Sequence, residues 1–377
     1  MRPATVEFLR QRFLSYYASA QVIAPNSLQQ REWGFLFFSS SGSTGMRRHV
    51  GFGSRDEITE YLRTMAPAHV FFSTAYYEDP GAPTMAAKGW AGADLIFDLD
   101  ADHIVDPRTT TYPAMLARVR DETVRLITVL TDELGFAERE LQVVFSGGRG
   151  YHIHVKDLAV RQFSSAERRE LINYVCGIGL DPALLLRPTA NPERGWQGRQ
   201  RRSLREYLAW LDSIGEKSAI AHISSLPGIG TGLARRIWDR RGHLGLGEGD
   251  TVERRLLRTL LSSENPDWRH RLKEAGIQAD EPVTTDIKRL IRTPGSLHGG
   301  SGLRVTPLDV RDLPMFDPLV DAVVFSDREV PVDILRPCQV PLLGSDIRLP
   351  EGPATVTESS AVFLCARGLA EMGGAHV

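Results

Sequence analysis

The feature that most restricts the fold of this chain is a glycine-rich turn between two short apolar strands, VVFSGGRGYHIHV at 143–155. Strand side chains alternate between faces, so His152 and His154 share one face of the second strand. The three glycines let the backbone approach an anion and present N–H groups to it, and Arg149 adds a charged fork suited to phosphate. The turn lacks the Gly-Lys-Ser/Thr end of a Walker A loop. We predict an anion-binding hairpin; an ordinary tight hairpin is the alternative.

A second motif places paired carboxylates at the end of an apolar strand, ADLIFDLDADH at 93–103. Asp98 and Asp100 point to one side of the strand and Leu99 to the other. Two ionised carboxylates this close repel each other unless one takes up a proton or a divalent cation binds. Oxygen-rich pairs suit magnesium or manganese, so we predict a metal site here. Aspartyl phosphatases and manganese-dependent sugar transferases use similar pairs, and a polar strand end without function is the other alternative.

A third motif, residues 279–303, combines acids, cations and a histidine in a glycine-bounded loop. Asp280 and Asp286 are candidates for a third metal-binding acid. The cations are Lys288, Arg289 and Arg292, and the loop histidine is His298. A carboxylate followed by cations is what a nucleoside triphosphate beside two metal ions requires. A surface helix with its cap and turn is the alternative.

The pattern along the chain predicts a mixed α+β fold with a helical insertion. Strands and helices alternate in 1–160 and return in 276–345, which we expect to form one discontinuous core. Helical periodicity dominates 161–275, and we treat 346–377 as a C-terminal tail with one last helix. Within the insertion we expect helices at 165–178, 203–213, 231–241, 251–262 and 267–275, with a loop at 187–202.

Within the core, EWGFLFFSS and MRRHVGFGS predict two strands of a hairpin around SGSTG. A long amphipathic helix is expected over 112–134, and the glycine at 135 ends it. The hairpin places Arg47, Arg48 and His49 on a strand, where they could reach phosphate or form a charged edge.

Composition excludes several classes of protein. The 377 residues contain three dispersed cysteines, which argues against a disulfide framework or a cysteine zinc site. No apolar run approaches the length of a membrane span and the start has no secretory signal, so we expect a cytoplasmic protein without a membrane partner. Residues 161–275 carry a net charge of +6 and the remainder −8, as expected if a nucleic acid lies beside a metal site; a solvated helical segment is the alternative.

Two weaker signals lie in the basic insertion. SSLPGIGTGLARRIWD at 224–239 has the form of a helix-hairpin-helix, whose turn presents backbone N–H groups to a DNA phosphate. An ordinary helix–helix turn is the alternative, and the pattern favours it. The arginine-rich segment 199–205 is a candidate template contact, which predicts salt-dependent DNA binding.

Taken in order, ADLIFDLDADH, SGGRGYHIHV and DEPVTTDIKRLIRTPGSLHG resemble the small catalytic subunit of archaeal and eukaryotic-type DNA primase. REWGF and RRHVGF resemble the N-terminal motifs of that family, and the resemblance covers roughly residues 5–325. It implies a primase-type catalytic core with an inserted helical subdomain. It also implies template-directed synthesis of short RNA, or DNA, primers on single-stranded DNA by nucleotidyl transfer, the reaction of a DNA-directed RNA polymerase.

The resemblance also implies roles for individual residues. It makes Asp98, Asp100 and Asp280 ligands of two magnesium or manganese ions. It implies that the triphosphate of the incoming nucleotide is bound by Ser146, Arg149, His152, Arg292 and His298. Arg48 corresponds to a further phosphate-binding arginine, and Glu32 to an acidic position near the nucleotide sugar.

One departure from the family concerns zinc. Many members carry a Cys/His zinc knuckle shortly after the aspartate pair, whereas residues 103–140 contain His103 and no cysteine. We therefore expect no zinc, and the helix at 112–134 in its place. The resemblance implies a large partner subunit with an iron–sulfur cluster, which three dispersed cysteines of this chain could not hold. A gap-filling polymerase of the same superfamily, a metal-dependent phosphatase or sugar transferase, and a non-catalytic DNA-binding subunit are the alternatives.

Overall fold

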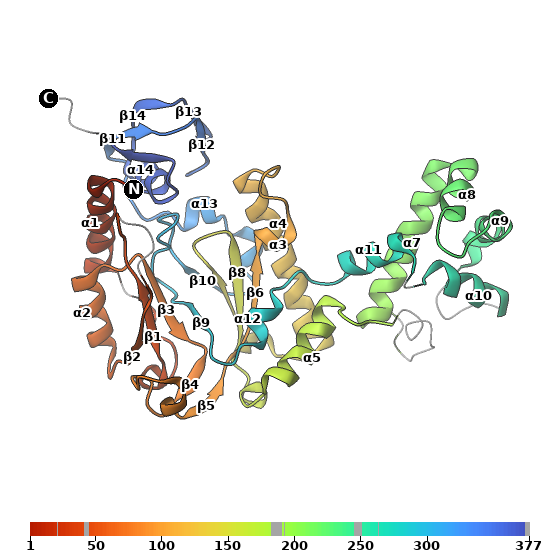
Figure 1. The fold of residues 1–377 in the computed structure, drawn as a ribbon, viewed down its shortest axis with the longest axis horizontal. Helices are drawn as coiled ribbons and strands as arrows, with labels where there is room; N and C mark the ends of the chain where they lie inside the picture. Colours follow the sequence, from red (N-terminus) through yellow and green to blue (C-terminus); the bar gives the residue numbers. More distant parts are fainter. Residues whose placement is uncertain are drawn as a thin grey trace. The chain divides into compact units, whose positions relative to one another are not determined.

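The computed structural model describes residues 1–20, 22–40, 45–181, 191, 193–244, 251–262 and 264–373. Contacts divide the chain into two units. The first contains residues 1–127, 136–169 and 279–377, and the second contains 128–135 and 170–278. The first unit mixes helices and strands and the second is helical, which confirms the predicted mixed α+β class (Figure 1).

Two four-stranded antiparallel sheets form the centre of the first unit. The first sheet has the order β2-β1-β3-β9, and its strands are β1 Trp33–Leu36, β2 Arg47–Val50, β3 His69–Ser73 and β9 Leu290–Arg292. The second has the order β10-β7-β8-β6, formed by β6 Leu95–Asp100, β7 Leu141–Phe145, β8 Gly150–Val155 and β10 Thr306–Leu308. The ring of Phe72 stacks on His154, so β3 packs against β8 and the two sheets share one interior.

Helices cover the outer faces of both sheets. Figure 1 shows α1 and α2 outside the first sheet and α4 outside the second. The helices of this unit are α1 Pro3–Ser19, α2 Arg55–Met65, α3 Ala101–Ile104, α4 Tyr112–Thr128, α12 Glu281–Thr285 and α13 Pro318–Asp321, with α5 Ser165–Cys176 at its boundary. The predicted helix over 112–134 is α4 followed by a π-helical turn at Val129–Glu133. A separate two-stranded antiparallel sheet of this unit is formed by β4 Ala75–Tyr77 and β5 Trp90–Ala93.

Both sequence-predicted hairpins pair as expected. β1 pairs with β2, although part of the intervening turn lies outside the described residues. β7 pairs with β8 around the glycine-rich turn, and both faces of β8 are buried. β6 joins β8 on its other side in a register that sets Asp98 opposite His152 and Asp100 opposite Gly150. The aspartate pair and the glycine-rich turn therefore meet at one end of the second sheet.

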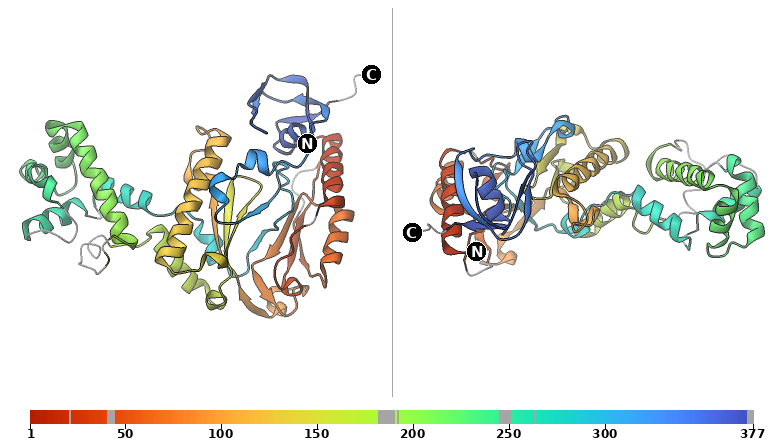
Figure 2. Two further views of the ribbon diagram at one scale, coloured as in Figure 1. Left: turned by 180° about the vertical axis from the view of Figure 1, so that it is seen from behind. Right: turned by 90° about the horizontal axis from the view of Figure 1, so that it is seen from above.

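The C-terminal residues form structure within the first unit. Strands β11 Glu329–Ile334, β14 Gly352–Thr357 and β15 Ala370–Met372 form a sheet, β12 Cys338–Val340 pairs with β13 Ile347–Leu349, and α14 spans Glu358–Ala366. Glu358 of α14 pairs with Arg12 of α1 at 3.0 Å, and the Thr5 hydroxyl accepts from the Met372 N–H at 2.9 Å. Figure 2 shows the same proximity, with the blue C-terminal part beside the red N-terminal helix. Residues 346–373 thus contribute strands and a helix where the sequence suggested a tail.

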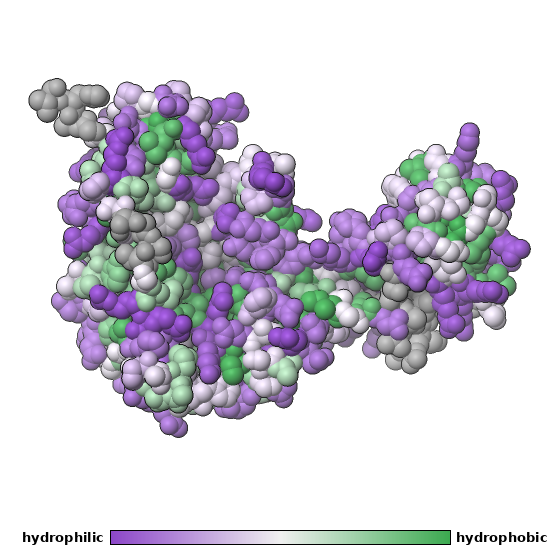
Figure 3. Space-filling model, viewed as in Figure 1, coloured by the Kyte–Doolittle hydropathy of each residue, from purple (hydrophilic) through white to green (hydrophobic). Residues whose placement is uncertain are grey.

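The second unit is a small helical bundle. It contains α7 Gly195–Ile214, α8 Glu216–Ser224, α9 Thr231–Arg240, α10 Thr251–Leu260 and α11 Pro266–Ala275, around a core that includes Tyr207, Ile223, Ile237, Leu260 and Trp268. The predicted loop at 187–202 is wrong in its second half, because α7 begins at Gly195. Over the face drawn in Figure 3, hydrophilic side chains spread across this unit between small hydrophobic patches.

The two weak signals of the insertion fall on α7, α8 and α9. α8 and α9 form the expected helical hairpin around a turn with Gly228 at φ 75°. In α7, Arg199 is buried and pairs with Glu133, so it is not available to a template. Arg205 is exposed. DNA contact by 224–239 stays a prediction. In the described part of the chain, no helix is both long and apolar enough to cross a membrane.

Candidate active site

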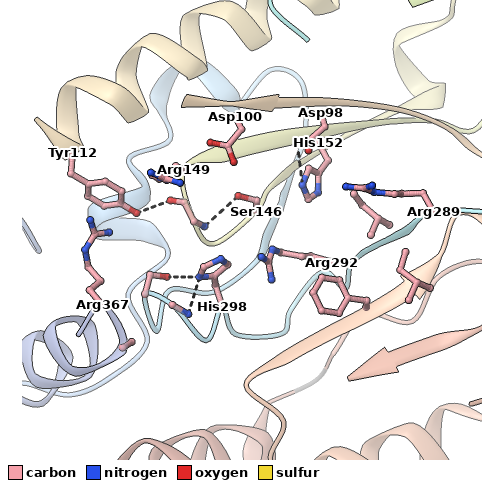
Figure 4. Close-up of a pocket in the computed structure, with 17 residues that line it drawn as sticks. Asp98, Asp100, Tyr112, Ser146, Arg149, His152, Arg289, Arg292, His298 and Arg367 are labelled. Atoms are coloured by element: carbon pink, nitrogen blue, oxygen red, sulfur yellow. Dashed lines mark hydrogen bonds and ion pairs between the residues drawn. The ribbon is translucent and has the colours of Figure 1, made fainter. Parts of the chain in front are cut away.

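One pocket of about 540 Å³ gathers most of the predicted site residues in the first unit. It is lined by side chains from β6, β8, β9, the glycine-rich turn and the loop after β9 (Figure 4). The predicted residues in its lining are Asp98, Asp100, Ser146, Arg149, His152, Arg292 and His298. Residues from three separate sequence motifs therefore share one cavity.

The glycine-rich turn is held in shape by its own serine. The Ser146 hydroxyl accepts from the N–H groups of Gly148 and Gly150 at 3.3 Å each. Gly150 lies so close to β6 that a Cβ there would stand 2.3 Å from the Leu99 carbonyl oxygen. Only glycine permits this approach, which brings the turn beside Asp100.

Arg149 extends from this turn toward solvent and pairs with Asp102, an acid that is not among the predicted metal ligands. Its Nη2 lies 2.6 Å from the Asp102 carboxylate, and both side chains are substantially exposed. Exposed pairs of this kind contribute little to stability, so Asp102 competes only weakly with a phosphate for Arg149.

Asp98 lies where its surroundings disfavour the charged form of its carboxyl group. Burial, together with the nearby carboxylates of Asp100 and Asp280, raises the pKa of Asp98 to about 7. The His152 Nε2 lies 3.4 Å from Asp98, while burial lowers the pKa of His152 to about 3. His152 is thus a neutral polar neighbour of Asp98 rather than a counter-charge.

Arg292 of β9 and Arg289, which directly precedes this strand, form the opposite wall, where Figure 4 shows both below the aspartates. Arg292 contacts the His69 Nδ1 at 2.6 Å, and burial lowers its pKa to about 10, which leaves it charged at neutral pH. Arg289, named within the cation cluster, also lines the pocket, whereas Lys288 does not. A permanent positive charge therefore faces the aspartate pair.

His298 lies between these walls in a loop tied to the glycine-rich turn. Its Nδ1 accepts from the Gly300 N–H at 3.2 Å and lies 3.3 Å from the Ser301 hydroxyl, which donates to the Gly147 carbonyl. Burial holds the pKa of His298 well below its usual value. A neutral ring whose Nδ1 accepts keeps its proton on Nε2, where it can donate to an anion.

Asp280 is joined to the site through the backbone. Its N–H donates to the Asp98 carbonyl at 2.8 Å, so the start of α12 is fixed against β6. Its carboxylate lies 4.0 Å from the His103 Nε2. Asp286, the other candidate acid, is exposed and accepts from the Lys288 N–H.

The donor chemistry of this corner suits a hard divalent cation. Asp98 and Asp100 present carboxylate oxygens to one cavity, and Asp280 adds a third within electrostatic reach of Asp98. Among the described residues, however, no three histidine, cysteine or acidic side chains are gathered closely enough to form a preassembled metal site. The residues fit the ion in kind, and Asp280 would have to turn from His103 to complete the set.

Besides Asp280, two predicted residues are absent from the lining of this pocket. Arg48 of β2 pairs with the buried Glu32 at 3.0 Å, and the Lys88 ammonium lies 3.8 Å from the same carboxylate. Neither Arg48 nor Glu32 is in the lining of this pocket. The phosphate role of Arg48 and the sugar role of Glu32 stay predictions.

Sequence reasoning missed Tyr112 and Arg367, which complete the pocket on the side of Arg149. Tyr112, the first residue of α4, donates its hydroxyl to the Gly148 carbonyl at 2.6 Å. Arg367 directly follows α14. No local pattern marks either residue, because each reaches the pocket only through tertiary packing.

Comparisons with known proteins agree with this geometry. The family model described as DNA primase small subunit matches residues 97–310. Proteins named DNA primase small subunit PriS are similar over nearly the whole chain. The relative from Methanosphaerula palustris is 57% identical, with 99% of both chains covered. Those from Methanoregula boonei and Methanocorpusculum labreanum are 53% and 48% identical, covering 99% of this chain and 100% of each relative.

The fold, the pocket and these matches define a nucleotidyltransferase-type enzyme that makes primers. Within that class, the chain belongs to the DNA primase small subunit family, in its archaeal form, and is the catalytic subunit. The family resemblance predicted from the motifs is thereby confirmed. The matches favour DNA replication over the phosphatase, sugar-transferase, gap-filling and non-catalytic alternatives.

Proposed function

We propose that this chain, as a DNA-directed RNA polymerase of the primase type, joins nucleotides in the pocket between Asp98 and Arg292. The observation that carries the proposal is the opposition of a carboxylate pair to two arginines and a neutral histidine across one cavity. Polyphosphate transfer needs both kinds of group, because cations must neutralise the phosphates while acids hold the catalytic ions.

The metal ligands of this proposal are Asp98, Asp100 and Asp280, with two magnesium or manganese ions. Bound there, the ions would lower the pKa of an attacking 3′-hydroxyl and neutralise charge on the phosphates. The like charges that raise the pKa of Asp98 support the assignment, since a cation would relieve their repulsion. The backbone bond from Asp280 to Asp98 favours Asp280 over the exposed Asp286.

In this proposal Arg149, Arg292 and His298 bind the triphosphate, while His152 and Ser146 position neighbouring groups. Arg149 and Arg292 supply permanent charge, and Arg149 can exchange its exposed pair with Asp102 for a phosphate. His298 donates from Nε2, and His152 orients Asp98. Ser146 keeps the turn open by accepting from two backbone N–H groups, so its contribution is to position Arg149.

The partners are inferred from what the relatives are called. They are named small subunits of DNA primase, which implies a large subunit and a DNA substrate for them. We extend this to the present chain: a single-stranded DNA template, nucleoside triphosphates and a large subunit that carries the iron–sulfur cluster. Support for the last point is that the three cysteines of this chain, Cys176, Cys338 and Cys365, are dispersed along the sequence and cannot hold a cluster.

Substituting the phosphate-binding residues should weaken nucleotide binding. We expect Arg149→Ala and His298→Ala each to raise the Michaelis constant for nucleotide roughly tenfold or more, because each removes a hydrogen bond to a charged group. Steady-state extension of a supplied primer measures this. Arg108→Ala is the control, because that exposed arginine pairs with Asp106 outside the pocket lining. An unchanged Michaelis constant in both variants would remove these residues from the triphosphate site.

A matched pair of variants tests the metal set. We expect Asp280→Ala to lose primer extension and to weaken the binding of Mn²⁺ alone, measured by titration calorimetry. Asp286→Ala should behave as wild type in both measurements, because its carboxylate faces solvent and accepts from Lys288. Full activity of Asp280→Ala, or loss confined to Asp286→Ala, would overturn the choice of the third acid.

A further inference from the structure

The residue that the proposed function leaves unexplained is Arg367, which reaches the pocket from the C-terminal part of the first unit. It follows α14 directly, and its N–H donates to the Phe363 carbonyl at 3.2 Å. α14 is held on α1 by the pair between Glu358 and Arg12 and begins with the side chain of Thr357 as its cap. A fixed helix therefore places Arg367 in the pocket near Arg149, although the two residues are more than 200 positions apart in the sequence.

Two aromatic rings fix the plane of the Arg367 guanidinium. Its central carbon lies 4.4 Å from the ring centre of Tyr112 and 5.0 Å from that of Phe363. Stacking of this kind occupies the flat face of a guanidinium and leaves its edge for hydrogen bonds, one of which goes to Tyr112. Tyr112 is in turn anchored to Gly148 through its hydroxyl, so the arginine is positioned against the glycine-rich turn.

The charge of Arg367 has no counter-ion in the described part of the chain. No carboxylate there forms an ion pair with it, and the charged residue that acts on it in the pocket is Arg149, another cation. Burial and this repulsion lower the pKa of Arg367. Two like charges that converge on an open cavity are stabilised when an anion binds between them.

The position of Arg367 indicates which part of a nucleotide it would meet. In Figure 4, Asp98 and His152 lie at one side of the pocket, while Tyr112 and Arg367 lie at the other, with Arg149 between. The carboxylates mark where the innermost phosphate must react, because that phosphorus forms the new bond. Phosphates that extend from the carboxylates across the pocket would pass Arg149 and end at Arg367.

We propose that Arg367 binds the terminal phosphate of the incoming nucleotide and gives the pocket its preference for triphosphates over diphosphates. This inference rests on the proposed function, since it takes the orientation of the nucleotide from the aspartate pair. A diphosphate ends one group short of Arg367, so only the triphosphate gains from it. Tyr112 is a positioning residue for Arg367, and the C-terminal structure becomes a part of the nucleotide site.

The test compares ATP with ADP, titrated with Mg²⁺ and no template into the full chain. We expect Arg367→Ala to weaken ATP binding by about tenfold or more, the effect of losing a charge-assisted hydrogen bond, and to change ADP binding by less than about twofold. Arg367→Lys should restore part of the ATP affinity, because it keeps the charge and loses the fork. Arg348→Ala, an exposed arginine on β13 outside the pocket lining, should match wild type with both nucleotides.

Three outcomes would overturn the inference: unchanged ATP binding in Arg367→Ala, an equal loss for ATP and ADP, or no rescue by lysine. An equal loss would mean that Arg367 only supports the pocket wall. Thermal melting of each variant separates unfolding from a binding defect, and Arg367→Lys remains informative if the alanine variant does not fold. Arg149→Ala distinguishes failure of this inference from failure of the proposed function. If it weakens ATP binding and Arg367→Ala does not, this inference alone fails; if neither does, the proposed nucleotide site fails as well.

Discussion

Alanine at Asp98 or Asp100 is expected to reduce extension of a supplied primer by about a thousandfold or more while the protein stays folded. Each substitution removes a carboxylate from the pair that faces the pocket arginines. Loss of a catalytic ion costs several kcal/mol of transition-state stabilisation, and about 4 kcal/mol corresponds to a thousandfold in rate. Both side chains are partly exposed and lie at a strand end, so little packing is lost.

The control for this prediction is Asp106→Ala. Asp106 lies beyond the end of this strand, where it is solvent-exposed and pairs with Arg108. It should extend primers at the wild-type rate. Retained extension in both Asp98→Ala and Asp100→Ala, with unchanged melting temperatures, would show that the carboxylate pair is not the catalytic centre.

The second large effect concerns stability. We expect Arg31→Ala to destabilise the first unit by about 3–5 kcal/mol, the usual result of leaving one partner of a buried ion pair unpaired. Arg31 is 1% exposed and pairs with Asp94 at 2.7 Å. The same guanidinium donates to the carbonyls of Ser73 and Thr74, at the end of β3. For a unit of this size the loss corresponds to a melting temperature lower by roughly 10 °C.

An exposed ion pair supplies the comparison. Arg311 and Glu138 lie 3.3 Å apart, with side chains 87% and 50% exposed. Arg311→Ala should change stability by less than about 1 kcal/mol, because exposed pairs contribute little. Differential scanning calorimetry can follow both variants, provided that the transition of the first unit is separated from that of the helical unit. Equal melting temperatures for Arg31→Ala and wild type would contradict the importance of the buried pair.

The sequence predicted the central chemistry because that chemistry depends on short-range rules. The two-residue period of a strand puts Asp98 and Asp100 on one side, and β6 has this geometry. The glycine-rich turn joins two adjacent strands, so its pairing required no knowledge of distant residues. Which motifs converge on one pocket was inferred only through the family resemblance, since antiparallel register between distant strands leaves no local pattern.

The parts that were missed depend on tertiary packing. Tyr112 was read only as the start of an amphipathic helix, and its bond to Gly148 follows from how α4 lies on the second sheet. Arg367 enters the pocket because α14 docks on α1, a contact between residues about 350 positions apart. The strands within 346–373 are only three to six residues long, so their pattern is too short to recognise.

Element boundaries failed where local and tertiary preferences disagree. The stretch at 187–202 is rich in proline, glycine and arginine, which favours a loop. The structure nevertheless begins α7 at Gly195, and burial of Trp196, Gln200 and Leu204 accounts for helix formation there. Packing of an amphipathic face outweighs a weak intrinsic propensity.

Primer synthesis on a bare single-stranded DNA template, with labelled nucleotides and Mg²⁺ or Mn²⁺, tests the central claim most directly. Wild type is compared with Asp100→Ala, each with and without the large subunit. A catalytic primase subunit built on this pocket should yield labelled oligonucleotides from the wild type without any supplied primer, and none from Asp100→Ala. Extension of a supplied primer without any start from nucleotides alone, or equal products from both proteins, would contradict it.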